Sequence, residues 1–242
     1  MSEHLNFKKI FAPTGELRAV INLGNAVLAK AGGKHEDPSG VTVDLAKKFA
    51  QQLDVPLKLI PVLKAADAVN HVATNKADIG FFAIDPERAS LISFTQPYVV
   101  IQGAYLVHDN STIKAIEDVD KAGNRIVVGH GSAYDLHLSR KIKNAEIIRA
   151  PSSQEVVSHF LSHRFEVAAG VKQQLEMDLA LVGGLRLLPG HFMEIQQAMG
   201  VSKERGQLAG EYLNQFVRLI KQSGEVHQIL DNNNVKGAAV AD

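Results

Sequence analysis

Short apolar runs alternate with amphipathic segments in the first part of the chain. Three apolar runs have the length of strands buried on both faces: Arg18–Leu23, Pro56–Val62 and Ile79–Ile84. Between them, apolar residues recur at helical spacing, in one segment at Val43, Ala46, Phe49, Ala50 and Leu53, and in the next at Ala65, Ala68, Val69, Val72 and Ala73. This β-α-β-α-β order predicts a mostly parallel sheet with right-handed crossovers.

A second block of the same kind follows. Its predicted strands are Arg125–His130, Ala145–Ala150 and Phe165–Val171, and its predicted helices are Tyr134–Lys143 and Gln154–Ser162. The extended, apolar segment "YVVIQGAYLV" joins the two blocks in place of a Gly/Ser tether. This organisation predicts two lobes joined by short hinge strands, with ligand bound in a cleft.

The C-terminal part begins with two further strand-like runs, Leu185–Pro189 and Glu194–Ser202. A long amphipathic helix follows, with an apolar stripe at Leu208, Tyr212, Phe216, Val217 and Ile220. The tail "NNNVKGAAVAD" is predicted to be frayed or loosely attached.

Composition excludes several function classes. The 242 residues carry 26 Lys+Arg and 26 Asp+Glu, so the chain lacks the basic surplus that is typical of a nucleic-acid-binding protein. Because there are no cysteines, disulfides, thiolate metal sites and cysteine nucleophiles are excluded. No Walker-type loop, dinucleotide fingerprint or nucleophile elbow is present, and we expect no cofactor.

Membrane and targeting signals are absent from the printed sequence. It contains no apolar run of 18 residues, and "MSEHLNFKKIFAPTG" lacks the basic-then-apolar order of a signal peptide. Two explanations stay open: a signal peptide that was left out of this chain, or a protein that never had one.

Several motifs occur in a characteristic order across nearly the whole chain: "GELRAVINLGN", "SGVTVDLAKKFAQQL", "NKADIGFFAIDPERASLISFTQPY", "IVVGHGSAYDLHL" and "AMGVSKE". With them the chain resembles the bacterial extracellular solute-binding proteins of family 3, which serve ABC importers. The resemblance implies an α/β, two-lobed type II periplasmic-binding-protein fold, each lobe being a mostly parallel sheet flanked by helices. It places lobe 1 at residues 1–99 plus 198–242, lobe 2 at residues 104–190, and hinge strands at 100–103 and 191–197.

The same resemblance carries expectations about function. It implies a monomer in the periplasm that traps a small anionic or zwitterionic ligand by hinge closure and then docks on an ABC permease. The alternatives are a cytoplasmic ligand sensor or orphan binder, and a dehydratase-like enzyme built on the same fold. We expect a binding protein and no enzyme.

Arg88 is the first candidate ligand-binding residue. Asp85 and Pro86 are favourable at the start of a helix, so Arg88 falls in a first turn, where the helix dipole mildly disfavours a cation. The resemblance places Arg88 where the family binds a carboxylate, and a guanidinium fork matches that group. The alternatives are a local pair with Asp85 or Glu87, or plain solvation.

A turn in the second block provides further candidates. "GHGSAYDL", Gly129–Leu136, follows a predicted strand and opens a helix, so free backbone N–H groups around Gly131 and Ala133, with the Ser132 hydroxyl, could bind an anion. The alternative for Ser132 is a simple N-cap, and both readings can hold together. His130 in this turn is a candidate for a cleft-lining or pH-sensitive contact.

Other positions depart from the family pattern. Phe81 and Ala83 stand where small hydroxyl residues are usual, and Val171 stands where an acidic residue usually takes the α-ammonium of the ligand, with Lys172 as a possible second cation. An acid that lacks this amine, or one that is oriented differently, therefore fits better than an amino acid held in the standard way. Strand alternation sends either Phe81 or Phe82 into the core.

The remaining candidate residues are two asparagines, a possible acid–base pair and a histidine pair. Asn22 and Asn25 are equally compatible with ligand binding and with loop-stabilising hydrogen bonds. For an enzyme, the acid–base candidates are Glu166 or Glu194 with His130. The i, i+4 pair His159 and His163 lacks fitting partners except Glu155, so we expect no metal.

Overall fold

The computed structural model describes residues 2–242, with side chains from Phe7 onward, and the chain forms two compact units. Unit 1 comprises the residues up to Val100 together with Gln196–Asp242, and unit 2 is Ile101–Ile195. Strands β5 (Val99–His108) and β10 (Met193–Ser202) carry the chain across the boundary. A hinge role for residues 100–103 and 191–197 stays a prediction.

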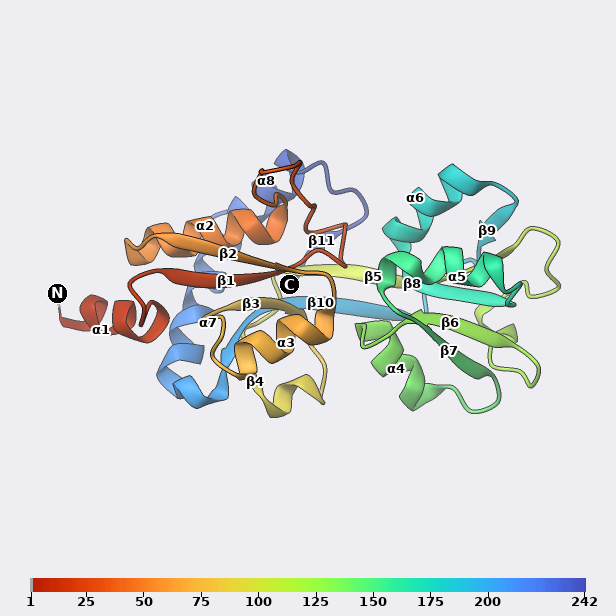
Figure 1. Cartoon of the computed structure of the whole chain (residues 1–242), viewed down its shortest axis with the longest axis horizontal. Helices are drawn as coiled ribbons and strands as arrows, with labels where there is room; N and C mark the ends of the chain where they lie inside the picture. Colours follow the sequence, from red (N-terminus) through yellow and green to blue (C-terminus); the bar gives the residue numbers. More distant parts are fainter. Residues whose placement is uncertain (1) are drawn as a thin grey trace. The chain divides into compact units, whose positions relative to one another are not determined.

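Unit 1 begins its sheet with the predicted β-α-β-α-β order. β1 (Leu17–Asn22) pairs in parallel with β2 (Leu57–Val62), and a parallel bridge between Ala19 and Ile79 brings the chain of β3 (Gly80–Ala83) to the other side of β1. Figure 1 shows the connecting helices α2 (Val41–Leu53) and α3 (Ala65–Ala73) on opposite sides of these strands. Right-handed crossovers that run in opposite directions along a sheet place their helices on opposite faces of it.

The prediction that β2 is buried on both faces is wrong. β2 lies at the sheet edge, where Lys58 and Pro61 are exposed and the other residues of the strand are half-buried. An edge position suits Pro61, because a proline cannot donate to a neighbouring strand. The apolar run alone could not distinguish an edge strand from a central one.

The remaining elements of unit 1 come largely from the C-terminal part. β10 pairs antiparallel with β3 and with β4 (Ile92–Phe94), so the sheet is mixed. The helical elements are α1 (Ser2–Phe11), α7 (Gln207–Gln222), α8 (Glu225–Asn232) and the 3-10 turns η1 (Arg88–Ser90) and η4 (Lys203–Arg205). The stripe predicted for α7 is confirmed at Phe216, Val217 and Ile220, but Leu208 is 60% exposed and Leu213 is buried instead.

The C-terminal tail is attached, contrary to the prediction. β11 (Ala239–Val240) pairs antiparallel with the start of β5, and the Ala241 amide donates to the Tyr98 carbonyl at 3.2 Å. The Lys221 ammonium also donates to the Asp242 carbonyl at 2.8 Å. Backbone pairing therefore holds a segment whose side chains carry little apolar surface.

Unit 2 has β6 (Arg125–Gly129) in parallel with β7 (Glu146–Ala150) on one side and β8 (Val167–Val171) on the other. β8 then pairs antiparallel with β5, which pairs antiparallel with β9 (Leu185–Leu187). The helical elements are α4 (Ala133–Lys141), α5 (Val156–Ser162), α6 (Lys172–Val182), η2 (Ile116–Asp118) and η3 (Ser153–Glu155).

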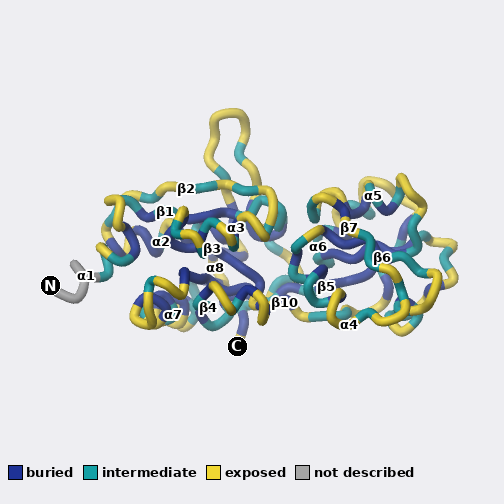
Figure 2. The backbone as a smooth tube through the Cα atoms, turned by 60° about the horizontal axis from the view of Figure 1, so that its bottom comes forward, coloured by how far each residue is buried: buried dark blue, intermediate teal, exposed yellow. Residues whose placement is uncertain are grey.

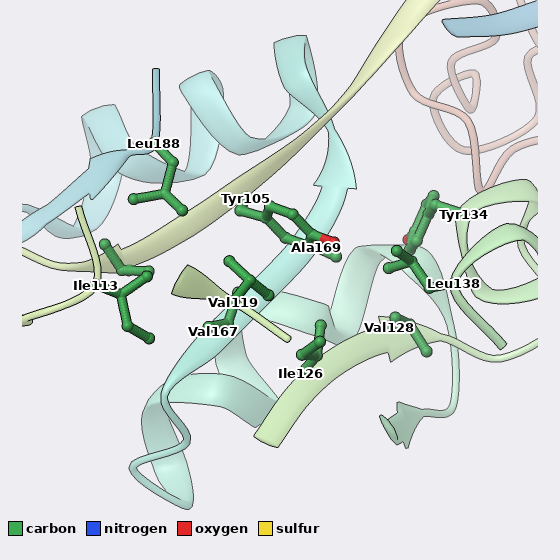
Figure 3. Close-up of a cluster of buried hydrophobic side chains, with 11 residues drawn as sticks. Tyr105, Ile113, Val119, Ile126, Val128, Tyr134, Leu138, Val167, Ala169 and Leu188 are labelled. Carbon is green, nitrogen blue, oxygen red and sulfur yellow. The ribbon is translucent and has the colours of Figure 1, made fainter. Parts of the chain in front are cut away.

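Strand alternation gives unit 2 a core on each face of its sheet. Ile126, Val128 and Ala169 pack with Tyr134 and Leu138 of α4, as Figure 3 shows. The alternate residues of the same strands pack against α5 and α6, in a cluster that includes Val127, Ala168, Phe160 and Leu175. In Figure 2 the backbone of these strands is buried and exposed backbone is found mainly in helices and loops. α4 and α6 thus flank opposite faces and both begin where a parallel strand ends.

Candidate functional site

Arg88 lies in a tight turn directly after β3. The Asp85 carboxylate accepts from the Glu87 amide at 2.9 Å, and the Asp85 carbonyl accepts from the Ala89 amide at 2.9 Å. One turn therefore forms as predicted, but it tightens into η1 and does not continue as a long helix. The result is a sharp return of the chain that brings Arg88 back over the end of β3.

The Arg88 side chain is buried. It is 6% exposed, and its guanidinium donates to the Ala83 carbonyl at 3.2 Å. Burial lowers the pKa of Arg88, while the nearby charges of Asp85 and Glu87 act in the opposite direction. An arginine keeps its charge even so, and a partly desolvated cation attracts an anion more strongly than a solvated one does. The solvated alternative for Arg88 is therefore wrong.

The aromatic residues of β3 divide between the two faces of the strand. Phe82 packs into the cluster around Val20 and Val72, whereas Phe81 makes an edge-to-face contact with Tyr98, with ring centroids 6.3 Å apart. Phe81 and Ala83 share one face by alternation, and both are buried. Both phenylalanines are thus buried, on opposite faces of the strand, and a ligand-facing role for Phe81 or Ala83 stays a prediction.

The two asparagines after β1 differ. The Asn22 side-chain oxygen accepts from the Gly24 amide at 3.0 Å, which is the loop-stabilising role. The Asn25 carbonyl accepts from the Leu28 and Ala29 amides at 3.1 and 3.0 Å, but its side-chain oxygen is buried and has no hydrogen-bond partner among the described residues. Asn25 is therefore the better candidate for a ligand contact.

In unit 2 the turn after β6 is held by its own side chains. Ser132 caps α4, because its hydroxyl oxygen accepts from the Asp135 amide at 3.0 Å, so the N-cap reading is confirmed. The Gly131 amide donates to the Asp135 carboxylate at 2.9 Å and is not the free donor that the sequence suggested. Gly131 has a φ of +70°, a left-handed conformation that suits glycine.

The turn therefore provides fewer hydrogen-bond donors for an anion than the sequence predicted. The amides of Ala133 and Tyr134 occupy the first two helical positions, which have no intrahelical acceptor in an α-helix. The Ser132 hydroxyl oxygen accepts from the Asp135 amide, and a hydroxyl can also donate one hydrogen bond. His130 is exposed, and its amide donates to the Ala150 carbonyl at 3.0 Å, which ties the turn to β7.

Asp135 and Arg149 are residues that the sequence reading missed. The buried Asp135 carboxylate accepts from the Arg149 guanidinium at 3.0 Å and from the Ser139 hydroxyl at 3.1 Å, besides Gly131. Arg149 lies on β7 and also donates to Ser139 at 2.8 Å. These contacts fix the conformation of the turn. We call the residues that make them the Asp135 network: Gly131–Ser132, Asp135, Ser139 and Arg149.

Val171 and Lys172 occupy the neighbouring strand end. β8 is parallel to β6 and adjacent to it, so the start of α6 and the Gly131–Ala133 turn lie at the same edge of the sheet. Val171 is half-buried and packs on the core beside α4, which explains why an apolar residue is stable there. Lys172 is the first residue of α6 and is half-buried.

The structure excludes one of the two acid–base pairs considered for an enzyme, Glu166 with His130. Glu166 precedes β8 and forms an ion pair with Arg125 at 2.7 Å, which holds the pKa of the Glu166 carboxyl below its usual value. His130 follows the opposite end of the parallel strand β6, roughly 15 Å away at about 3.3 Å per residue. Glu166 and His130 therefore cannot act as an acid–base pair. Glu194 is exposed at the start of β10.

Two further observations concern metal and membrane. The His159 and His163 rings lie 4.4 Å apart and pack on Phe165, and from Phe7 onward, where side chains are described, no three His, Asp or Glu side chains are placed to hold one metal ion. In the same range, none of the helices combines the length and the apolar character needed to cross a membrane.

Comparison with known proteins gives the following matches. The sequence profile of the bacterial extracellular solute-binding proteins, family 3, matches residues 28–234. The amino-acid-binding protein AabA of Dichelobacter nodosus is 26% identical over 137 residues, which are 55% of this chain and 53% of AabA. The chain thus spans about half the length of this curated relative.

Solved structures of similar fold cover nearly the whole chain. A candidate binding component of an ABC transporter from Wolinella succinogenes DSM 1740, complexed with lysine, has a TM-score of 0.78 at 24% identity, over 92% of this chain and 97% of that one. The ancestral amino-acid-binding protein AncCDT-1, a precursor of cyclohexadienyl dehydratase, has a TM-score of 0.77 at 20% identity, over 94% and 99%. At these identities the likeness shows the fold, which is the predicted type II periplasmic-binding-protein fold.

Proposed function

Because this chain belongs to the bacterial extracellular solute-binding proteins, family 3, we propose that it binds an amino acid or a related organic acid as the substrate-binding component of an ABC importer. AabA is an amino-acid-binding protein, and the Wolinella protein was crystallised with lysine, which supports this ligand class. The partner would be an ABC permease and the working state a monomer in the periplasm. Fractionation and size-exclusion chromatography of the expressed protein test these last two points.

The buried Arg88 carries the proposal. Its guanidinium lies at the end of β3 and is held there by the Asp85 turn and by the Ala83 carbonyl. A carboxylate can accept two parallel hydrogen bonds from such a fork, and desolvation strengthens the charge pair. The α4 turn, with Ser132 and Ala133, is the proposed second contact for the ligand, from unit 2.

A thermal-shift screen of L-amino acids and simple organic acids tests the proposal. A ligand that binds only the native state, at 100 times its Kd, adds about 2.7 kcal/mol to the free energy of unfolding. This should raise the Tm by about 5–10 °C in a protein of this size. The compound should be recovered unchanged by mass spectrometry, whereas an enzyme would convert it.

Arg88→Ala is the decisive variant, with Arg218→Ala as the matched control. Arg218 is exposed on α7 and should have no effect on binding. Loss of a buried charge pair costs 2–5 kcal/mol, so Arg88→Ala should weaken carboxylate ligands about 30-fold or more by calorimetry. If an acid binds wild type and Arg88→Ala equally well, Arg88 does not bind its carboxylate.

A further inference from the structure

The first turn of α6 contains a buried hydrogen-bond acceptor that the protein leaves unused. The side-chain oxygen of Gln174 is buried and has no partner among the described residues. A buried acceptor without a donor is costly, about 1–3 kcal/mol, and such groups are rare in native proteins. The cost is removed if a bound molecule supplies the donor.

A neighbouring carboxylate fixes the orientation of the Gln174 amide. Its nitrogen donates to Asp178 at 3.1 Å, one helical turn further along α6. Flipping the amide would turn its oxygen toward that carboxylate, so the observed orientation is the favourable one. Burial raises the pKa of Asp178, and its hydrogen bond with Gln174 acts in the opposite direction. The side-chain oxygen of Gln173 is also buried and unpartnered among the described residues, but no neighbouring carboxylate there fixes the orientation of its amide.

The place of Gln174 in the fold follows from the helix it belongs to. It is the third residue of α6 and therefore lies in the first turn of that helix. Its amide nitrogen is occupied by Asp178, so the side-chain oxygen is the atom that stays available to a donor. This first turn lies at the strand-end edge of unit 2, beside the Gly131–Ala133 turn on the adjacent parallel strand.

From this placement we infer that the Gln174 oxygen is a specificity-determining acceptor for the ammonium group of an amino-acid ligand, an inference that rests on the proposed function. A neutral amide oxygen accepts an N–H bond without bringing a second buried charge. It would take the amine in a site whose strand-end residue, Val171, offers no polar group. The helix is anchored by the buried Leu175 and the half-buried Leu179, which pack in the core of unit 2.

The experiment compares each L-amino acid that binds with its desamino acid, which has the same carbon chain and carboxylate but no ammonium group. In wild type the amino acid should bind about 10- to 100-fold more tightly, as expected for a hydrogen bond to a charged group. In Gln174→Met, which keeps the length of the side chain, this preference should fall to about threefold or less, while the desamino acid binds as before.

Two variants separate the acceptor role from a structural one. Asp178→Asn keeps an acceptor for the Gln174 amide nitrogen but no longer prevents the amide from flipping, so the preference should fall by less than in Gln174→Met. The double variant Gln174→Glu with Asp178→Asn exchanges the two groups, so that an amide at position 178 holds a carboxylate at position 174. The preference for the amine, lost in Gln174→Met, should then return to the wild-type value or exceed it. A merely structural role for Gln174 would not predict this recovery.

The outcomes distinguish this inference from the proposed function. If amino acids bind, Arg88→Ala weakens them and Gln174→Met keeps the full preference for the amine, the inference is wrong and the proposed function stands. If no amino acid or organic acid stabilises wild type, the proposed function fails and the inference fails with it. Gln215→Met, on the exposed surface of α7, controls for the substitution itself.

Discussion

Two buried carboxylates, Asp78 in unit 1 and Asp135 in unit 2, have similar partners at opposite ends of parallel strands. Asp78 is fully buried and pairs with Arg18 at 2.8 Å and with Arg205. The Asp135 side chain is 4% exposed and pairs with Arg149 at 3.0 Å. Asp78 precedes β3 and contacts the start of β1, whereas Asp135 follows the end of β6.

The position along the strand separates a stability role from a site role. In α/β sheets ligands bind at the carboxyl ends of the strands. The Asp78 pairs lie at the other end, where Arg205 also connects Asn75 and the Ile10 carbonyl. The Asp135 network lies at the ligand end and holds the Gly131 amide. We therefore expect the loss of Asp78 to change folding alone, and the loss of Asp135 to change binding as well.

The largest effect is expected for Asp78→Ala. It leaves two arginines without their carboxylate, and their side chains are only 19% and 8% exposed. Breaking a buried ion pair from one side costs 3–5 kcal/mol of the free energy of unfolding. Urea denaturation measures this loss, and ligand affinity of the remaining folded protein should stay at the wild-type value.

A milder variant keeps this half of the comparison testable if Asp78→Ala does not fold. Asp78→Asn retains one acceptor oxygen and should cost less than Asp78→Ala. A loss below 1 kcal/mol in both variants would contradict a role of Asp78 in stability, and a loss of ligand affinity in Asp78→Asn would contradict the separation of the two ends.

Much of the fold was predictable because hydrophobic burial determines it locally. Continuous apolar runs indicated β1 and β3, and 3.6-residue periodicity indicated α2 and α3. α6 was not predicted, since its apolar residues Met177, Leu181 and Val182 are exposed and obscure the periodicity. The attached tail could not be predicted, because backbone pairing with β5 leaves no side-chain pattern.

The candidate site was predictable only in part. The Ser132 cap follows from local sequence, because its partner is three residues away. The contacts of Asp135 with Arg149 depend on the placement of α4 beside β7, which no local rule contains. The burial of Arg88 likewise depends on the return of its turn over β3. Residues that act through distant partners require the structure.

Asp135→Asn tests the other half of the comparison and should have a smaller effect on stability. Asparagine keeps one acceptor for the Gly131 amide, and the Arg149 side chain is 44% exposed and can be hydrated. We expect a loss of about 1–2 kcal/mol in urea denaturation. Because the turn is less constrained, carboxylate ligands should bind several-fold more weakly by calorimetry. Unchanged affinity with a loss as large as that of Asp78→Ala would make Asp135 a purely structural residue.

The smallest effect is expected for the third carboxylate pair, Arg125 with Glu166, which gives a reference for partly exposed charges. The two side chains are 38% and 31% exposed, so the pair should contribute less than about 1 kcal/mol. The Arg125 hydrogen bond lowers the pKa of Glu166 below its usual 4.5, so this contribution is present above pH 4.5 and is lost as the pH falls through the lowered value. Glu166→Gln should therefore destabilise the protein slightly at pH 7, and the difference from wild type should shrink toward zero in acid. Since Glu166 lies at the end of β8 away from the Gly131 turn, ligand affinity at pH 7 should not change, and a measurable loss would show that the two strand ends are coupled.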